Sequence, residues 1–319
     1  MDAKPKLLDQ VRNKLRAKHY SYRTEKQYLA WIRRFIVHHG KRHPAEMSAA
    51  QIEAFLTHLA VQDNVSASRQ NQALSAILFL YHQVLEIELP WLDNVVRARM
   101  PVRVPVVLAT HEVQALLSYL DGQFHLLAQL LYGSGLRLME GLRLRVKDVD
   151  FEYSQIVVRD GKGHKDRVTI LPAAVRSPLE IHLAAVKQQH ERALDRGYGG
   201  VELPEALARK YPNAAKAWGW QFVFPAARPS RDPRVGEPRR HHLHETSVQR
   251  AIREAARRVG ILKPVGPHTL RHCFATHLLE NRYDIRTVQE LMGHADVRTT
   301  QIYTHVMKKG AGAVKSPLD

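Results

Sequence analysis

The stretch GPHTLRHCFATHLL, residues 266–279, reads as an apolar helix that begins with two polar side chains capable of chemistry. His268 and Arg271 stand three positions apart, and residues with this spacing lie on the same side of a helix. The start of this helix therefore presents an imidazole and a guanidinium together. Cys273, in the same apolar helix, is expected to be packed rather than reactive. Helical patterns dominate the chain on both sides of this stretch, so the expected fold class is mainly α.

The composition favours a polyanionic partner. The 319 residues are 45% hydrophobic and 25% charged, which suits a globular protein with length for two domains. Lys and Arg total 48 against 31 acidic residues, a formal net charge of +17. Residues 1–106 hold 16 basic and 9 acidic side chains, and residues 107–319 hold 32 and 22, so both halves are basic. Such a balance points to nucleic acid, although charge that serves only solubility is the alternative.

Cysteine usage and hydropathy exclude several classes of protein. Cys273 is the only cysteine, which rules out an intramolecular disulfide and a cysteine zinc cage and fits a reducing cytoplasm. The sequence has no apolar N-terminal run and no apolar span of 18 residues, so neither export nor membrane insertion is expected.

Residues 1–92 are expected to form a small bundle of four amphipathic helices. One of them, TEKQYLAWIRRFIVHHG, has Thr24 followed by Gln27, the spacing of a capping box, and Ser48 with Gln51 repeats that spacing at the start of another. Residues 93–106 contain interrupting prolines and three arginines, which predicts a basic linker. Residues 107–319 form the second predicted domain.

A β-hairpin is expected inside the second domain. QIVVRDGKGHKDRVTILP, residues 155–172, places two β-branched runs, 156–158 and 168–170, around a Gly-Lys-Gly turn. Lys162 then lies near the hairpin tip. Helical patterns return from about Ala173 to Leu194, and further helices are expected to start near residues 246, 269, 284 and 297. The fold class is therefore mainly α with a small β-hairpin or sheet.

Five short motifs follow one another in the second domain. YGSGLRLMEGLRL contains an arginine after a Gly-x-Gly turn, the hairpin carries a lysine, and a His-x-x-Arg pair, a Gly-His pair after a helix and a tyrosine follow. Each motif alone is common, but the ordered set resembles that of the tyrosine recombinases of the lambda-integrase type. The family's catalytic residues then fall on Arg137, Lys162, His268, Arg271, His294 and Tyr303. Its supporting acidic residue falls on Glu140.

The resemblance implies that the first domain is a helical core-binding domain and the second a catalytic domain with Tyr303 as nucleophile. A phenol has a pKa near 10, so at pH 7 the shortage of phenolate costs about 4 kcal/mol and a nearby base is useful. The family assigns His268 as proton acceptor or positioner of Tyr303, and His294 as a hydrogen-bond donor to the phosphate. Arg137 and Arg271 neutralise the non-bridging oxygens.

No cofactor is expected. The resemblance implies that Lys162 protonates the leaving 5′ oxygen and that a 3′-phosphotyrosyl link conserves the energy of the phosphodiester, so neither ATP nor metal is required. The chain has no Gly-x-x-x-x-Gly-Lys-Ser/Thr loop and no His-Glu-x-x-His motif. His268 and His272 have a spacing that suits a metal ion, but Arg271 lies between them. His272 and His277 are therefore expected to be structural.

Residues 192–222 are expected to form an insertion that marks one group of the family. YGGVELPEALARKYPNAAKAWGWQFVFP, residues 198–225, resembles the additional helix of integron integrases, and DIRTVQELMGH and TTQIYTHV are similar to the same group. This resemblance implies two DNA partners, namely gene-cassette sites folded as single-stranded hairpins and a duplex integration site. The DNA-binding residues that match are Trp220, Arg239, Arg240, His241 and His242.

The family further implies a homotetramer in the synaptic complex and action in the bacterial cytoplasm, on the nucleoid. Three alternatives remain open at the level of sequence: a duplex-specific recombinase of the phage-integrase or chromosome-dimer-resolution type, a non-catalytic DNA-binding protein with the same fold, and a metal-dependent nuclease.

Overall fold

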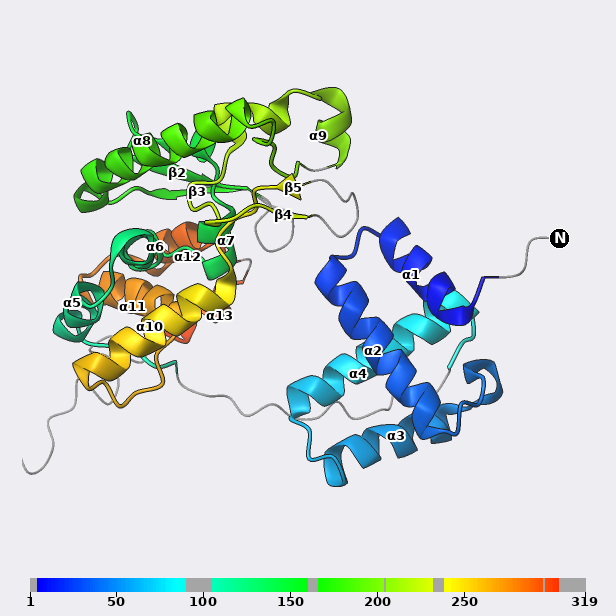
Figure 1. The fold of residues 1–319 in the computed structure, drawn as a ribbon. Helices are drawn as coiled ribbons and strands as arrows, with labels where there is room; N and C mark the ends of the chain where they lie inside the picture. Colours follow the sequence, from blue (N-terminus) through cyan, green and yellow to red (C-terminus); the bar gives the residue numbers. More distant parts are fainter. Residues whose placement is uncertain are drawn as a thin grey trace, which may run out of the picture. The chain divides into compact units, whose positions relative to one another are not determined.

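Two separate hydrophobic cores divide the chain into the units Met1–Arg103 and Val104–Asp319. The structure, a computed structural model, describes residues 5–89, 105–159, 166–203, 205–231, 238–294 and 296–303 (Figure 1). Most of the expected linker, residues 93–106, and the hairpin tip with Lys162 lie outside the described residues.

The first unit contains the four expected helices. Their bounds are α1 Leu7–Ala17, α2 Tyr22–His38, α3 Ala49–Val61 and α4 Ala67–Phe79, with a 3-10 turn, η1, at Pro44–Glu46 and a π-helical continuation of α4, η2, at Leu80–Leu85. Gln51 accepts a hydrogen bond from the Ser48 amide at 2.7 Å, which confirms that Ser48 starts α3. The prediction that Thr24 caps α2 was wrong. Ser21 caps this helix instead, because its hydroxyl accepts a hydrogen bond from the Thr24 amide.

Aromatic side chains fill the core of the first unit. Phe35 and Phe55 meet edge to face, with ring centroids 5.4 Å apart. The fully buried Tyr81 hydroxyl donates to the Pro44 carbonyl oxygen at 2.8 Å, so the end of α4 is tied to the turn before α3.

The second unit is mainly helical with two small antiparallel sheets. Its α-helices are α5 Thr110–Ser118, α6 Gly122–Gly133, α7 Leu138–Arg143, α8 Ala173–Asp195, α9 Glu205–Lys210, α10 Glu245–Val259, α11 Pro267–Glu280, α12 Ile285–Met292 and α13 Arg298–Gln301. Its 3-10 turns are η4 Val146–Asp148, η5 Ala214–Lys216 and η6 Trp218–Trp220. The starts of α10 to α13 confirm the sequence expectation to within two residues. None of the described helices combines the length and apolar character needed to cross a bilayer.

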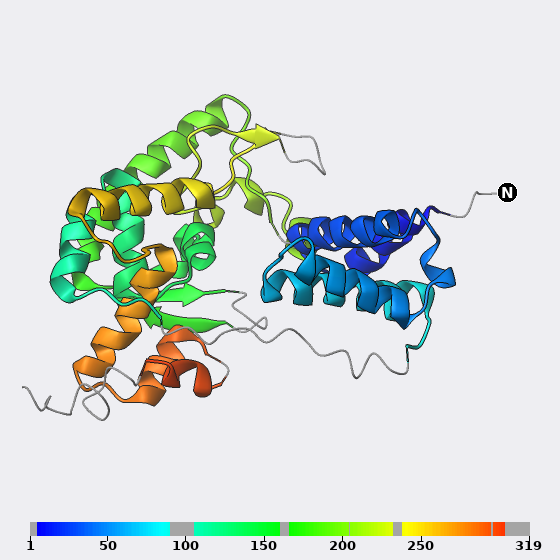
Figure 2. The ribbon, with the colours of Figure 1, turned by 90° about the horizontal axis from the view of Figure 1, so that it is seen from below.

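The predicted hairpin is present and belongs to a three-stranded sheet in the order β1 (Val149–Asp150), β2 (Gln155–Val158), β3 (Arg167–Ile170). Val158 pairs with Arg167 and Gln155 pairs with Ile170. Figure 2 shows β2 and β3 beside α12, and β3 packs on that helix. The strand β1 and a second ribbon, β4 (Ser230–Arg231) with β5 (Pro238–Arg239), were not expected, because two-residue strands leave no periodic signal.

Helix α11 is the central helix of the second unit. It packs against α6, α10 and α12, and the first two lie side by side with it in Figure 1. Its side chains from Leu270 to Leu279 are almost all buried, Cys273 among them, which confirms that this cysteine is packed. The turn before α7 presses against it. Gly135 has a φ of +63°, and a Cβ there would overlap the Phe274 ring. Glycine therefore brings the backbone of this turn onto α11.

Candidate active site

Arg271 is a buried cation at the centre of the site. Its guanidinium projects from α11 and is 3% exposed. One terminal nitrogen donates to the Gly135 carbonyl oxygen, and the other donates to the Met292 carbonyl oxygen at 2.5 Å. Burial, with the nearby charge of Arg137, lowers the pKa of Arg271 to about 9, which leaves it charged at pH 7. Arg271 thus joins the turn before α7 to the end of α12.

His294 is held beside Arg271 by the end of α12. Gly293 ends that helix in the left-handed conformation at φ +61°, as the sequence predicts. His294 Nε2 lies 3.2 Å from Arg271 Nη2, and Nδ1 lies 2.9 Å from Thr300 Oγ1. Because a guanidinium only donates hydrogen bonds, Nε2 is the acceptor and Nδ1 carries the proton that is donated to Thr300.

Arg137 and Glu140 form the expected pair at the start of α7. Glu140 accepts hydrogen bonds from the Arg137 backbone amide at 2.8 Å and from its Nη1 at 2.6 Å. The second Arg137 terminal nitrogen lies 3.5 Å from the Gly293 carbonyl oxygen. Burial raises the pKa of Glu140, but Arg167 and Arg137 outweigh that effect and hold it at about 2. Glu140 is therefore ionised at neutral pH, and it lies beside the two arginines that are expected to bind phosphate.

Tyr303 is buried against the same group of side chains. Its side chain is 2% exposed, and its ring stacks on that of His294 with centroids 6.4 Å apart. Burial raises the pKa of the phenol, while Arg271 and Arg137 oppose the rise. The site thus gathers Arg137, Arg271, His294 and Tyr303 from four segments.

The residue that contacts the Tyr303 hydroxyl is His272. Its Nδ1 lies 2.7 Å from the hydroxyl oxygen, whereas among the described residues no hydrogen bond joins Tyr303 to His268. Burial, with His268 and Arg271, lowers the pKa of His272 to about 4. The neutral ring can accept the phenol proton in a hydrogen bond. The expectation that His272 has only a structural role overlooked this contact, although its position one turn after His268 places it on the same helix face.

His268 lies at the exposed start of α11, where a substrate can reach it. Partial burial of the ring, together with Arg271 and Arg137, lowers its pKa. His268 is therefore neutral near pH 7 and able to accept a proton. His277, in contrast, lies between the Tyr132 hydroxyl at 2.8 Å and the Leu108 carbonyl oxygen at 2.9 Å, a structural role as expected.

The expected DNA-binding residues lie apart from these side chains, around the segment 198–242. The Trp220 ring is half-buried and carries Lys147 Nζ over its face, 3.1 Å from the ring centroid. His241 is exposed, whereas His242 is buried and its Nδ1 lies 2.7 Å from the Leu243 carbonyl oxygen. Of the two adjacent rings, only His241 is presented to solvent.

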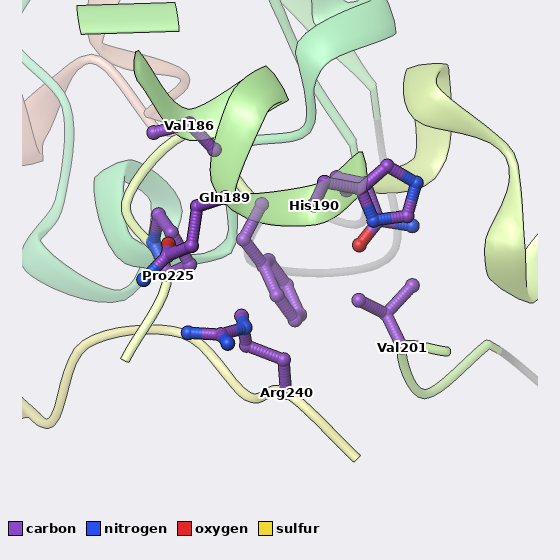
Figure 3. Close-up of a pocket in the computed structure, with 8 residues that line it drawn as sticks. Val186, Gln189, His190, Val201, Pro225 and Arg240 are labelled. Carbon is purple, nitrogen blue, oxygen red and sulfur yellow. The ribbon is translucent and has the colours of Figure 1, made fainter. Parts of the chain in front are cut away.

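Arg239 and Arg240 are both half-buried. Arg239 ends β5 and pairs with Ser230 in the ribbon. Arg240 donates to the Ala226 carbonyl oxygen at 2.9 Å and lines a cavity of about 10 Å³, which is large enough only for water. Figure 3 shows this cavity between α8, with Val186, Gln189 and His190, and the facing residues Val201, Pro225 and Arg240.

An open depression of about 470 Å³ lies beside Trp220. Its lining consists of Lys210, Tyr211, Pro212, Asn213, Ala214, Ala217 and Trp220. Its volume is in the range of ligand pockets, and it combines two aromatic rings with a cation. Arg145 fixes this segment to the rest of the unit through hydrogen bonds to the carbonyl oxygens of Trp220, at 2.6 Å, and Glu202, at 2.8 Å.

Within the described part of the chain, no three His, Cys, Asp or Glu side chains come together as a metal site. Arg137, Arg271, His294 and Tyr303 together form a site suited to an anion. Guanidiniums bind a phosphate, imidazoles accept or donate protons, and a phenol attacks.

Comparison with known proteins identifies both units. Residues 107–309 match the model of the phage integrase family, and residues 7–91 match that of the phage integrase N-terminal SAM-like domain. An integrase/recombinase of Escherichia coli is 51% identical over 314 residues, which cover 98% of this chain and 93% of that protein. A tyrosine recombinase XerD of Agrobacterium fabrum is 32% identical over 303 residues, which cover 88% and 82%.

The fold is also that of a solved recombinase. The structure of a lambda integrase fragment, residues 75–356, as a dimer bound to a COC′ core site superposes with a TM-score of 0.61. The match covers 98% of both chains at 15% identity, so it speaks for the fold alone.

The stability that Glu140 contributes should depend on pH. Its pKa of about 2 lies below the ordinary 4.5, so the carboxylate stabilises the folded state above about pH 4.5 and loses this effect as the pH falls towards 2. At a pH where Glu140 is fully ionised, this pKa shift corresponds to about 3 kcal/mol of unfolding free energy. The difference in unfolding free energy between wild type and Glu140→Gln, measured by urea unfolding, should therefore shrink between pH 6 and pH 3. Glu152→Gln, at an exposed carboxyl of the same unit, is the control, and a pH-independent difference for Glu140→Gln would contradict the assignment.

The hydrogen bond between His272 and Tyr303 should appear as an energetic coupling. A double-mutant cycle with His272→Ala and Tyr303→Phe is expected to give about 0.5–1.5 kcal/mol in unfolding free energy, because a buried hydroxyl loses its acceptor. His272→Asn should retain most of the stability, since its side-chain amide can replace Nδ1. The cycle of His268→Ala with Tyr303→Phe is the control and should give a coupling near zero. Equal coupling in both cycles would reject the contact.

Proposed function

The chain belongs to the phage integrase family of tyrosine recombinases, enzymes that transfer DNA strands through a tyrosine, and from this premise we propose that it is an integron integrase. It cleaves and rejoins DNA through a 3′-phosphotyrosyl link at Tyr303. Its substrates are gene-cassette sites folded as single-stranded hairpins and a duplex integration site. It inserts and excises cassettes as a homotetramer on nucleoid DNA.

The observation that carries the catalytic proposal is the convergence of Arg137, Arg271 and His294 beside the Tyr303 ring. Attack by the phenol oxygen on phosphorus forms the phosphotyrosyl bond and breaks the bond to the 5′ oxygen. Negative charge grows on the non-bridging oxygens, where two guanidiniums stabilise it most because both are shielded from water. His294 follows as a hydrogen-bond donor once the phosphate replaces Arg271 as the partner of Nε2 and the ring proton moves from Nδ1 to Nε2. Nδ1 then accepts a hydrogen bond from the Thr300 hydroxyl.

Proton transfer completes the reaction. The exposed, neutral His268 accepts the phenol proton, and Lys162 supplies the proton of the leaving oxygen. Tyr303 is 2% exposed, and its hydroxyl is hydrogen-bonded to His272. The segment from Arg298 to Tyr303 must therefore move before the hydroxyl can reach DNA. His272 therefore keeps the phenol protonated and buried in the free protein, which limits attack on DNA that does not open the site.

The depression beside Trp220 supports recognition of folded cassette sites. A hairpin made from one strand presents unpaired bases, and such bases stack on aromatic rings. Trp220, Tyr211 and the exposed His241 supply rings in the inserted segment 192–222 and next to it. The similarity to a tyrosine recombinase named XerD favours the second candidate, a duplex-specific tyrosine recombinase. In an intact duplex the bases are paired, so these rings would have no unpaired base to stack on.

Covalent trapping tests the nucleophile. Wild-type protein incubated in EDTA with a suicide substrate, nicked so that the leaving strand diffuses away, should give a denaturant-resistant protein–DNA adduct, because the reaction needs no metal. Tyr303→Phe should give none and should still shift the substrate in a gel. Tyr283→Phe, at a tyrosine that is 54% exposed, is the matched control and should form the adduct normally. An adduct with Tyr303→Phe would assign the nucleophile elsewhere.

Hairpin preference separates the two candidate functions. Trp220→Ala should weaken binding of a folded cassette hairpin by about 5- to 150-fold, since stacking contributes about 1–3 kcal/mol per base. Binding of the duplex integration site should stay within about 3-fold, since phosphate contacts dominate there. Tyr153→Ala, at an aromatic residue that is 74% exposed, is the control. Equal losses on hairpin and duplex would favour the duplex-specific recombinase.

A further inference from the structure

Strand β3 turns its polar side chains inward. Arg167 and Thr169 face the interior, with Thr169 1% exposed, whereas Val168 and Ile170 are 47% and 42% exposed. In an ordinary strand at a protein surface, apolar side chains face the interior and polar side chains face the solvent, so the order in β3 is reversed. The Thr169 hydroxyl donates to the Ser134 carbonyl oxygen at 2.8 Å, in the turn that leads to Arg137. The inward face of β3 therefore makes specific polar contacts with the segment that carries a phosphate-binding arginine.

Arg167 makes the strongest of these contacts. Its two terminal nitrogens donate to the two Glu140 oxygens at 2.9 and 2.7 Å, a bidentate pair, and its side chain is only 10% exposed. The same carboxylate accepts two hydrogen bonds from Arg137 and lies 3.8 Å from Arg271. Glu140 is thus shared by three arginines, and of these Arg167 is the one whose guanidinium binds both carboxylate oxygens.

The charge balance shows what Arg167 contributes. Arg167 neutralises Glu140, so the positive charges of Arg137 and Arg271 remain uncompensated and available to an anion. Without Arg167, the full negative charge of Glu140 would act on Arg137 at 2.6 Å, at low exposure, where ion pairs are little screened. The existing ion pair of Arg137 with Glu140 would then be stronger, and Arg137 would attract a phosphate less.

Arg167 also fixes the backbone before His294. Its Nε donates to the Leu291 carbonyl oxygen at 3.0 Å. A Cβ at Gly293 would lie 2.6 Å from Arg167 Cδ, so the left-handed glycine and the arginine stem are in direct contact. One side chain on β3 therefore joins the start of α7 to the end of α12.

We propose that Arg167 is a positioning residue for the strand-transfer reaction. It keeps the positive charge of Arg137 available to the scissile phosphate by neutralising and orienting Glu140, and it positions the backbone before His294 through its contacts with Leu291 and Gly293. This inference rests on the proposed function, because it assigns Arg167 a role in the same phosphoryl transfer.

Two suicide substrates of the same sequence test this role, one with the natural scissile phosphate and one with a methylphosphonate there. The methylphosphonate lacks the negative charge that Arg137 neutralises. Arg167→Gln should slow single-turnover adduct formation on the natural phosphate by about 10- to 100-fold. This is less than the roughly 100- to 1000-fold for loss of a donor that itself contacts the phosphate, because Arg167 acts through Arg137. On the methylphosphonate the loss should fall below about 3-fold, as it should for Arg137→Gln, because less charge develops there. DNA affinity should stay within about 3-fold of wild type, since one contact among many phosphate contacts is affected.

Arg167→Lys gives an independent measurement if Arg167→Gln does not fold. Lysine keeps the charge but cannot form the bidentate pair, so the same substrate-dependent loss is expected to a smaller degree. Arg176→Gln, an exposed arginine on α8, is the control and should react as wild type on both substrates.

The outcomes are distinct. A loss confined to the natural phosphate supports the proposal. An equal loss on both substrates shows a merely structural role, and wild-type rates show none, so either result overturns it. If wild-type protein itself forms no Tyr303-dependent adduct on the natural phosphate, the proposed function fails instead.

Discussion

Concentrating Arg137, Arg167 and Arg271 at one place requires a buried negative charge, and Glu140 supplies it. Three guanidiniums that lie within 3.8 Å of one carboxylate would repel one another strongly without it, because they are shielded from water. The Glu140 carboxylate lies among them and holds a pKa of about 2. The carboxylate accepts hydrogen bonds from a backbone amide and from side-chain nitrogens. It therefore orients the arginines as well as balancing their charge. The rest of the site is arranged around this carboxylate, because α7, β3 and α12 meet through the groups that it binds.

The free protein combines a charged anion site with a buried phenol, the nucleophile that we propose. The phenol of Tyr303 is buried, its hydroxyl is hydrogen-bonded to His272, and its ring stacks on His294. The neutral state of His272 suits this arrangement, since a protonated ring could not accept the hydroxyl proton and would add a further charge near Arg271. If Tyr303 is the nucleophile, as we propose, substrate binding must supply the free energy that exposes its phenol. The groups proposed to bind the phosphate are then in place while the nucleophile is still covered.

The segment 198–242 has a different physical character from the proposed catalytic residues. Two of its aromatic rings and one cation, Lys210, line an open depression, and Arg145 anchors its backbone through hydrogen bonds to carbonyl oxygens. His241 and His242 illustrate why neighbouring residues of one type are not equivalent. His241 is exposed. Burial lowers the pKa of His242 to about 4, and its ring is hydrogen-bonded to the Leu243 carbonyl oxygen. The base-contacting surface that we propose therefore contains fewer side chains than the run of arginines and histidines from Arg239 to His242 in the sequence.

Local pattern in the sequence determined the helices of both units, the paired strands β2 and β3, the glycine that ends α12 and the place of His268 and Arg271 at the start of α11. These features depend on residues within one or two turns of each other, which periodicity and capping chemistry describe. Only the tertiary structure decided that His272 contacts Tyr303, 31 positions away, and that Arg167 binds Glu140, 27 positions away. It also decided that β3 faces inward with its polar side. The physical reason is that these contacts arise from helix packing around α11 and from the charge of a shared carboxylate, and neither is encoded in the spacing of neighbouring residues.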